Sequence, residues 1–366
     1  MKRAAFLYVF FVSIGLMINS CSKESVLPPA TTATWNRIAT IPEISTVSQV
    51  VAGPSNIYAV GLGADGYYFI SIDKNNQVVE KRPIHWPYKL FLTKDFYATV
   101  DNSGNAMGDT TVIKFYSTSL SHPDPMATLN SKKFWSAATT NLFNTADVRF
   151  SPYSLSDNSY GVIVRFGPVA ATNVDVATIR VDENGVAIVN KQSVGTFVAV
   201  STPYYDNDWM VAYKDKFLVK FPNSLYQYDP LGVVSQVAST SDNYNGLSAS
   251  NWVRHDSLFM TSGGLIDDNL YYMTDINDTW RSIKNSSAIP NYFVVDNFFV
   301  SYNGQALDLY KIDKNSNQLT KYKSDQLSGI TNPSGYRSPL VEFKDQVLLF
   351  SGNIAYTKPL SAFTTR

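Results

Sequence analysis

Aromatic rings beside polar side chains recur at five places in the chain, and they are the residues best suited to binding chemistry. The residues of this set are Trp86, Tyr88, Tyr204, Tyr205, Tyr244, Tyr292, Tyr336 and Arg337. An aromatic plane beside an amide, a carboxylate or a guanidinium group can stack on a sugar ring while the polar group binds its hydroxyls, or it can anchor a protein partner. The alternative is that these rings pack inside the fold.

Catalytic and metal-binding patterns are sparse in this sequence. None of the three histidines, His85, His122 and His255, has a second histidine or a cysteine at metal-ligand spacing. No Gly-x-Ser-x-Gly nucleophile segment and no phosphate-cradling glycine loop occurs. We therefore predict no metal site and no cofactor, and we favour a non-catalytic protein. The alternative is an enzyme whose carboxylates or tyrosines come from separate segments.

Short segments rich in aspartate, asparagine and glycine could bind calcium through oxygen ligands. They begin at Asp65, Asp101, Asp182 and Asp267. None continues into a full calcium loop with its distal glutamate, and tight hairpin turns need the same residue types. We favour plain turns, with calcium as the alternative.

Strands are the elements that must position these residues. Runs of β-formers alternate with polar residues between glycine, asparagine and proline clusters, and no stretch keeps a helical period for long. A strand ending in aspartate, a polar turn and a second strand recur as a unit. Its aspartates, which we interpret as turn formers, are Asp73, Asp182, Asp229, Asp275 and Asp313. A weaker copy at residues 112–117 fills the longest gap, so the period is roughly 45 residues.

A period of this length matches one blade of four antiparallel strands in a β-propeller. We predict an all-β propeller of about seven blades over residues 34–366, with six or eight blades as other possible numbers. A two-sheet sandwich or a β-solenoid is the alternative fold. The last repeat unit ends without an outer strand. The segment around Trp35 is similar to the segment around Trp280, which holds the outer-strand position of its unit. We therefore predict that an N-terminal outer strand closes the ring.

The resemblance to propeller families rests on this period and strand pattern. Residues 277–282 resemble the Asn-Asp-x-Trp segment of kelch repeats, with Gly263 and Gly264 upstream. The resemblance implies a fold and no activity. In such a fold, the connections from each outer strand to the next inner strand share one face, where propellers usually build their binding sites. The aromatic set described above falls on these connections.

The N-terminus has the layout of a secretion signal. Lys2 and Arg3 precede an apolar run over residues 4–17, which is too short for a spanning helix. A small residue then precedes Cys21, the only cysteine of the chain. An ordinary signal peptide with an incidental cysteine is the alternative to a lipid anchor.

Residues 18–21 resemble the lipoprotein box of Bacteroidota, which implies that Cys21 is lipidated. We predict a signal peptide over residues 1–20 and a lipidated cysteine with a flexible tether over residues 21–33. The charged residues after Cys21 resemble a surface-export tag. We therefore expect an outer-membrane lipoprotein, with the cell surface favoured over the periplasmic face.

The amino-acid composition limits which classes of partner the protein can bind. The chain has 30 basic and 30 acidic residues, and losing Lys2 and Arg3 would leave a net charge of about −2, so we expect no nucleic-acid partner. A 14% aromatic content with 23 tyrosines suits a large sheet protein. We predict a cell-envelope lipoprotein that acts as a non-catalytic binding or scaffold propeller for a glycan or a peptide. The alternative is a propeller enzyme acting on carbohydrate.

Overall fold

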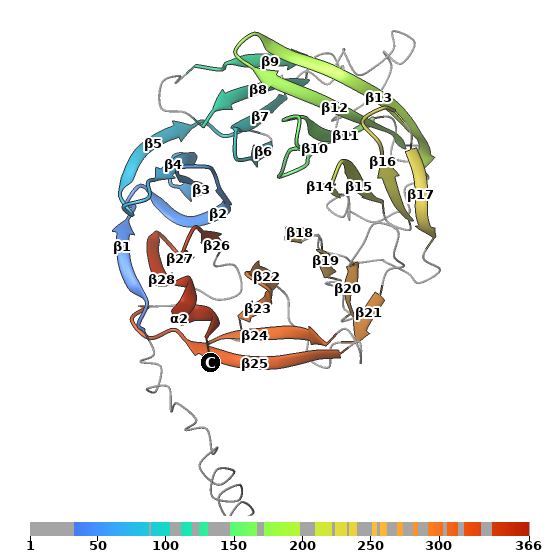
Figure 1. Ribbon diagram of the computed structural model, residues 1–366. Coiled ribbons are helices and arrows are strands. Elements are labelled where there is room, and N and C mark those ends of the chain that lie inside the picture. Colours follow the sequence, from blue (N-terminus) through green and yellow to red (C-terminus); the bar gives the residue numbers. More distant parts are fainter. Residues whose placement is uncertain are drawn as a thin grey trace, which may run out of the picture.

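The protein is a ring of β-sheets in a computed structural model. The residues described are 33–87, 89–102, 111–118, 124–130, 147–166, 172–197, 209–221, 224–232, 234–239, 251–254, 257–261, 269–273, 281–284, 292–302, 306–313, 318–330 and 339–365. Within these ranges the strands form seven four-stranded antiparallel sheets, and Figure 1 shows the sheets arranged around a common centre. This arrangement is a β-propeller, as predicted. No helix in these ranges is long and apolar enough to cross a membrane.

Six of the sheets each take four consecutive strands, counted from the centre outward. The first three are β2 (Ile44–Ala52), β3 (Ile57–Gly63), β4 (Tyr67–Ile72) and β5 (Val78–Ile84); β6 (Lys89–Leu92), β7 (Phe96–Asn102), β8 (Thr111–Ser117) and β9 (Ala127–Asn130); and β10 (Asp147–Phe150), β11 (Tyr160–Phe166), β12 (Thr172–Asp182) and β13 (Gly185–Phe197).

The next three sheets follow the same order. They are β14 (Trp209–Tyr213), β15 (Lys216–Phe221), β16 (Ser224–Tyr228) and β17 (Val234–Ser239); β18 (Asn251–Arg254), β19 (Ser257–Thr261), β20 (Asn269–Met273) and β21 (Arg281–Lys284); and β22 (Tyr292–Val295), β23 (Phe298–Tyr302), β24 (Ala306–Asp313) and β25 (Gln318–Gln326).

The seventh sheet joins the two ends of the domain. It contains β26 (Leu340–Phe343), β27 (Gln346–Ser351) and β28 (Ile354–Pro359), and β1 (Asn36–Thr40) is its outer strand. Asn36 lies opposite Thr357 and Thr40 lies opposite Ile354. The predicted closure by an N-terminal outer strand is confirmed, and this strand begins at Asn36, directly after Trp35. The short helix α2 (Leu360–Thr364) follows β28 directly and was not predicted.

The recurring aspartates form turns between the third and fourth strands. Asp73 Oδ1 accepts hydrogen bonds from the backbone N–H groups of Asn75, at 2.9 Å, and Gln77, at 2.8 Å. Asp182 and Asp229 each accept one backbone N–H in the same way, at 2.8 Å. The turn prediction is confirmed for these three. Asp275 lies outside the described residues, and of Asp313 only the backbone, at the end of β24, is described.

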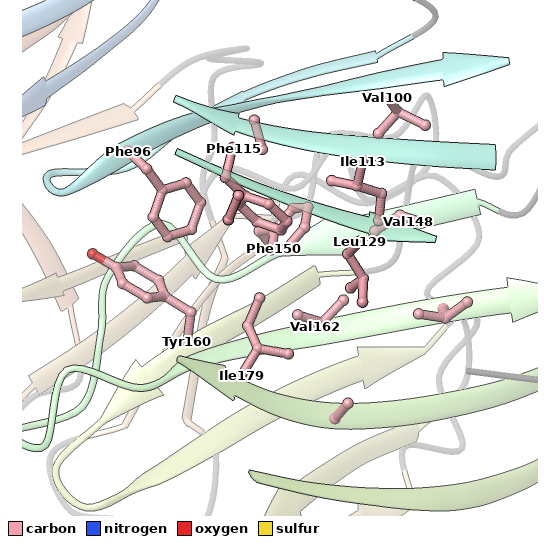
Figure 2. Packing of buried hydrophobic residues seen from close by; sticks show 14 residues of the cluster. Phe96, Val100, Ile113, Phe115, Leu129, Val148, Phe150, Tyr160, Val162 and Ile179 are labelled. Carbon is pink, nitrogen blue, oxygen red and sulfur yellow. The ribbon is translucent and has the colours of Figure 1, made fainter. Parts of the chain in front are cut away.

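Apolar side chains between neighbouring sheets form the core. Figure 2 shows one such cluster, in which Phe96 and Phe115 of one sheet meet Phe150, Tyr160 and other buried residues of the next. Phe96 packs against Phe150 and Tyr160 at ring-centroid distances of 6.2 and 4.8 Å. Burying a side chain of this size contributes roughly 1.5–3 kcal/mol. Each sheet therefore depends on its neighbours, which is why the ring must close.

Some tyrosines take part in this packing rather than in surface contacts. Tyr58, Phe69, Tyr97 and Tyr116 stack in series across the first two sheets, with centroids 5.7, 5.0 and 4.7 Å apart. The Arg82 guanidinium lies over Phe69 and Tyr97 and donates a hydrogen bond to the Tyr97 hydroxyl at 3.3 Å. Burial raises the pKa of Tyr97 to about 12. Much of the aromatic content is therefore structural.

Candidate functional site

Strand alternation gives the ring two faces. Because all strands within a sheet are antiparallel, second-to-third and outer-to-next-inner connections share one face, which we call the Trp86 face after the connection from β5 to β6. First-to-second and third-to-fourth turns share the other face. We call it the Lys94 face after the turn between β6 and β7. Trp86, the member of the predicted aromatic set whose side chain is described, lies on the Trp86 face.

Of that predicted set, the structure describes one side chain. Trp86 lies in the connection from β5 to β6, and the backbone of Tyr292 begins β22. The other members lie outside the described residues: Tyr88, Tyr204, Tyr205, Tyr244, Tyr336 and Arg337. Cys21 also lies outside them. Whether the set gathers around one mouth stays a prediction.

Trp86 is exposed and supported from beneath. Its side chain is 62% exposed, and its ring meets that of Tyr67 at the start of β4 with centroids 5.6 Å apart and an interplanar angle of 72°. Tyr67 pairs with Ile84 in the sheet, two positions before Trp86. The indole is therefore attached to a strand end and still open to a ligand.

A close-packed turn fixes the backbone below this pair. Gly66 has a φ of +140°, and a Cβ atom there would approach the carbonyl oxygen of Ile84 to 2.7 Å. Gly63 donates its N–H to the Gly66 carbonyl at 2.7 Å, which closes the turn. Only glycine allows both the conformation and the approach, so the turn holds the chain leading to Trp86 in place.

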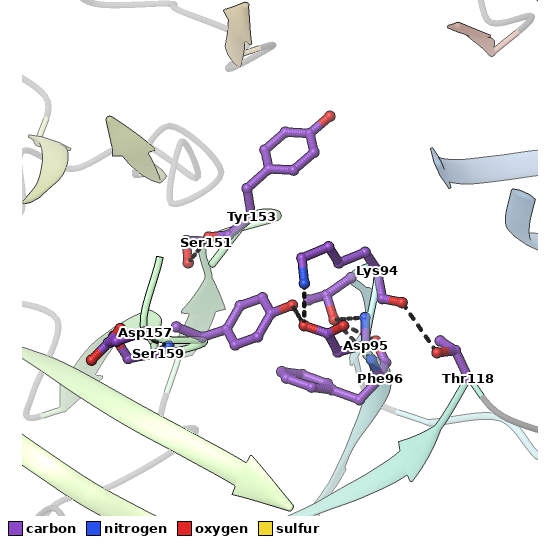
Figure 3. Close-up of polar contacts among 10 residues, drawn as sticks. Lys94, Asp95, Phe96, Thr118, Ser151, Tyr153, Asp157 and Ser159 are labelled. Carbon is purple, nitrogen blue, oxygen red and sulfur yellow. Dashed lines mark hydrogen bonds and ion pairs between the residues drawn. The ribbon is translucent and has the colours of Figure 1, made fainter. Parts of the chain in front are cut away.

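The Lys94 face carries a second polar arrangement, built on a rigid turn. Thr93 Oγ1 donates to the Phe96 carbonyl at 2.7 Å and accepts from the Phe96 N–H at 3.0 Å. Thr118 donates its hydroxyl to the Lys94 carbonyl at 3.1 Å and its N–H to the Asp95 carbonyl at 3.3 Å. The turn backbone is thereby satisfied, and the Lys94 and Asp95 side chains project from a fixed base (Figure 3).

Tyr160 of the neighbouring sheet holds the Asp95 carboxylate. Its hydroxyl donates to Asp95 Oδ2 at 2.5 Å, and Lys94 Nζ approaches the same oxygen at 2.7 Å. Burial, and then the adjacent Asp95 carboxylate, raise the pKa of Tyr160, so its hydroxyl keeps its proton and acts as a donor. The Lys94 and Asp95 side chains remain 28% and 38% exposed.

Tyr153 stands on the next sheet, in the loop of residues 151–159 between β10 and β11. It is 41% exposed. The loop itself is anchored, because Ser151 Oγ donates to the Tyr153 carbonyl at 2.9 Å and Leu155 donates its N–H to the Ser159 carbonyl at 2.9 Å. Figure 3 shows Tyr153 on the same side of Asp95 as the Lys94 side chain in that view.

Sequence reasoning missed this second arrangement. Residues 93–96 resemble any hairpin turn, and Asp95 and Tyr160 are 65 positions apart. Their contact depends on which two sheets are neighbours in the ring. A local sequence pattern does not contain this information. The sequence holds no local signal for this arrangement, and the 41% exposure of Tyr153 is known only from the structure.

A metal site is not formed by the part of the chain that the structure describes. No three histidine, cysteine, aspartate or glutamate side chains meet there in a group that could hold an ion. The turn aspartates Asp73, Asp182 and Asp229 use a carboxylate oxygen on backbone N–H groups. Calcium at the acidic segments stays a prediction to be tested.

The fold and the radial sheets define the class of protein, which is a β-propeller. No family model matches the chain. No curated protein matches it either. The chain is similar in structure to the polysaccharide lyase Uly1, with a TM-score of 0.51, 8% sequence identity, and coverage of 87% of this chain and 90% of that one. At this identity the likeness shows the fold alone.

Two further solved structures match with lower TM-scores. One is the AfRom2 CNH domain, with a TM-score of 0.48, 6% identity, and coverage of 88% of this chain and 98% of that one. The other is the WD40 domain of coronin from Toxoplasma gondii, with a TM-score of 0.47, 12% identity, and coverage of 88% and 83%. The predicted kelch-like character of residues 277–282 stays a prediction.

Proposed function

We propose that this protein is a cell-envelope lipoprotein whose propeller recognises a glycan or a peptide through the Trp86 face, without catalysing a reaction. The observation that carries the proposal is Trp86, 62% exposed and held against Tyr67. An exposed indole on a fixed backbone offers a large contact area at a small entropic cost, which is typical of binding anchors.

Exposure separates Trp86 from the structural aromatics. Tyr97 and Phe69 are 1% and 0% exposed and serve the contact between sheets. Among the described residues, Trp86 and Tyr153 are the aromatic side chains that rank as exposed large hydrophobic groups. Leaving a ring of this size in water forgoes roughly 1.5–3 kcal/mol of burial, which a ligand would recover.

Attachment to the envelope forms the second half of the proposal. A lipid on Cys21 and a tether over residues 22–33 would hold the ring close to the outer membrane, with the cell surface favoured. The anchor is tested with Cys21→Ala, followed by fractionation and by mass analysis of the mature N-terminus. We expect the variant to leave the membrane fraction. A variant that stays membrane-bound would contradict the anchor and leave the binding proposal standing.

The binding test uses the full-length protein in a detergent without a sugar headgroup. A panel of oligosaccharides and peptides is screened by calorimetry against the wild type, Trp86→Ala and Leu231→Ala. Leu231 is the matched control, because it is an exposed apolar residue, 87% accessible, in the turn after Asp229 on the other face. We expect at least about a tenfold weaker affinity in Trp86→Ala and no change in Leu231→Ala.

The same screen distinguishes binding from catalysis. Products of each oligosaccharide are measured after long incubation, and intact ligand supports the non-catalytic proposal. Steady cleavage would instead support the carbohydrate-acting enzyme. Equal affinities in the wild type and Trp86→Ala would remove the Trp86 face from the proposal.

A further inference from the structure

We propose that Lys94, Asp95 and Tyr153 form a second ligand site, on the Lys94 face, for a neutral polyhydroxyl ligand such as a glycan ring. This site is separate from the one proposed on the Trp86 face. It is built from the first-to-second strand turns of two neighbouring sheets, those of β6 to β9 and β10 to β13.

Lys94 and Asp95 retain hydrogen-bonding capacity. The contacts of the Asp95 carboxylate with Tyr160 and Lys94 both use Oδ2. Within the described residues, Oδ1 has no hydrogen-bond donor, and a carboxylate oxygen accepts two. Lys94 Nζ has three N–H donors and directs one toward Asp95. One acceptor oxygen, Asp95 Oδ1, and two N–H donors of Lys94 Nζ therefore remain available.

The charge of this pair selects the class of ligand. Lys94 and Asp95 together are neutral, so neither an anion nor a cation gains from their combined field. Neighbouring hydroxyls on a sugar match the pair better, because one hydroxyl donates to Asp95 Oδ1 while the next accepts from Lys94 Nζ. The pair is partly exposed, at 28% and 38%, so a ligand can reach both groups.

Tyr153 adds an apolar surface to this polar pair. A pyranose ring has one face of C–H groups, and an aromatic ring is the usual surface on which it packs. Tyr153 is 41% exposed. The strands β6 and β10, which precede the two turns, are the innermost strands of two neighbouring sheets in Figure 1. A ligand crossing from one sheet to the next would meet both turns.

Preorganisation supports a binding role. Thr93 and Thr118 fix the turn backbone, and Tyr160 fixes the Asp95 carboxylate from the neighbouring sheet. Ser151 fixes the loop that carries Tyr153. A ligand would therefore pay little entropy to order these groups, and weak individual contacts can sum to a measurable affinity.

The experiment measures binding of neutral hexaoses of glucose, mannose and N-acetylglucosamine to the full-length protein by saturation-transfer NMR and calorimetry. The variants are Asp95→Asn, Lys94→Met and Tyr153→Ala. Asp157→Asn is the matched control, because Asp157 lies in the same loop as Tyr153 but is paired with Arg180. We expect one hexaose to bind, with at least about tenfold weaker affinity in each of the three variants and no change in the control.

Two further comparisons keep the result decisive. Trp86→Ala distinguishes the faces, since binding at the Lys94 face must survive it while binding at the Trp86 face must not. Circular dichroism and melting curves check each fold. If Asp95→Asn unfolds because Tyr160 loses its acceptor, Lys94→Met and Tyr153→Ala decide the question. The inference is overturned if no hexaose binds, or if folded Lys94→Met and Tyr153→Ala bind as the wild type does.

Discussion

Lys358 and Asp325 form a buried ion pair across the last gap of the ring, with Lys358 Nζ 2.5 Å from Asp325 Oδ1. Their side chains are 3% and 6% exposed. Lys358 belongs to β28 of the closing sheet, and Asp325 belongs to β25, the outer strand of the sheet before it. Trp35 completes the contact, because its Nε1 donates to Asp325 Oδ2 at 3.0 Å. One carboxylate thus joins both ends of the domain.

Removing this carboxylate should destabilise the whole domain. In Asp325→Ala, Lys358 would be a buried charge without its partner, so we expect unfolding to require about 3–5 kcal/mol less free energy. Chemical denaturation followed by tryptophan fluorescence measures the change. The double variant Asp325→Leu with Lys358→Met removes both charges, so its free energy of unfolding should fall by less than that of Asp325→Ala. A single variant as stable as the double one would show that the pair does not constrain closure.

Trp35 should make two separable contributions to closure. It is 2% exposed and packs edge-to-face on Phe363 of α2, with centroids 5.9 Å apart. Trp35→Phe keeps much of this packing and loses the N–H donor, so we expect a cost of about 1–3 kcal/mol. Trp35→Ala also opens a cavity and should cost about 3–5 kcal/mol. Thermal melts of both variants test this order, and equal melting temperatures for wild type and Trp35→Ala would contradict it.

Asp175 should make stability fall as the pH rises. Burial raises the pKa of this carboxyl above its ordinary 3.8, although Lys191, 3.8 Å away, partly offsets the shift. The folded state then holds the proton more tightly than the unfolded chain. Stability attributable to Asp175 is therefore lost as the pH rises from 3.8 through the higher folded pKa. We expect Asp175→Asn to remove this penalty, so its advantage over wild type should grow between pH 4 and pH 7 in urea titrations.

Asp157 provides a control because its pKa shift has the opposite sign to that of Asp175. Partial desolvation alone would raise its pKa, but hydrogen bonds from Ser159 and Arg180 outweigh that effect and hold the pKa below the ordinary 3.8. Its contribution is present above pH 3.8 and is lost as the pH falls through the lower folded pKa. Asp157→Asn should therefore cost stability at neutral pH and nothing in strong acid. The free energy of unfolding of each variant, taken relative to wild type, should therefore change with pH in opposite directions. A change in the same direction for Asp175→Asn and Asp157→Asn would contradict both pKa shifts.

Calcium removal should leave the fold unchanged. Two of the acidic segments already have partners for their carboxylates. Asp182 Oδ1 accepts the backbone N–H of Asn184, as a metal-free hairpin requires, and Asp101 forms an ion pair with Lys114. We expect the same melting temperature in excess EDTA and in millimolar calcium. A rise in the melting temperature with calcium alone, absent with magnesium, would show that one of the acidic segments is an ion site.

The aspartate turns and the four-stranded repeat unit were predictable because their causes are local. A side chain such as Asp73 reaches backbone groups two and four residues ahead, so five consecutive residues contain the interaction. The alternation of strands and turns repeats about every 45 residues, and that period specifies a four-stranded unit. Closure by β1 was predictable for a related reason, since the last unit lacked a strand and the segment at Trp35 supplied one.

The candidate sites were less predictable. Sequence pattern placed Trp86 in an outer-to-inner connection, and the structure added its support by Tyr67. The pairing of Asp95 with Tyr160 was missed, because a turn residue and a strand residue on different sheets share no periodicity. Short helix α2 was also missed, since five residues following a strand are too few to show a helical period.

The sequence by itself determined the strand type, the turn chemistry, the repeat length and the strand that closes the ring, because each depends on neighbouring residues or on a regular period. Only the tertiary structure decided which side chains meet between sheets. Trp35 and Asp325 are 290 positions apart. Their contact exists because closing the ring adds the first strand to the last sheet and so brings Trp35 beside the sheet before it. Contacts of that kind are set by the geometry of the whole ring, so no local stretch of sequence contains them.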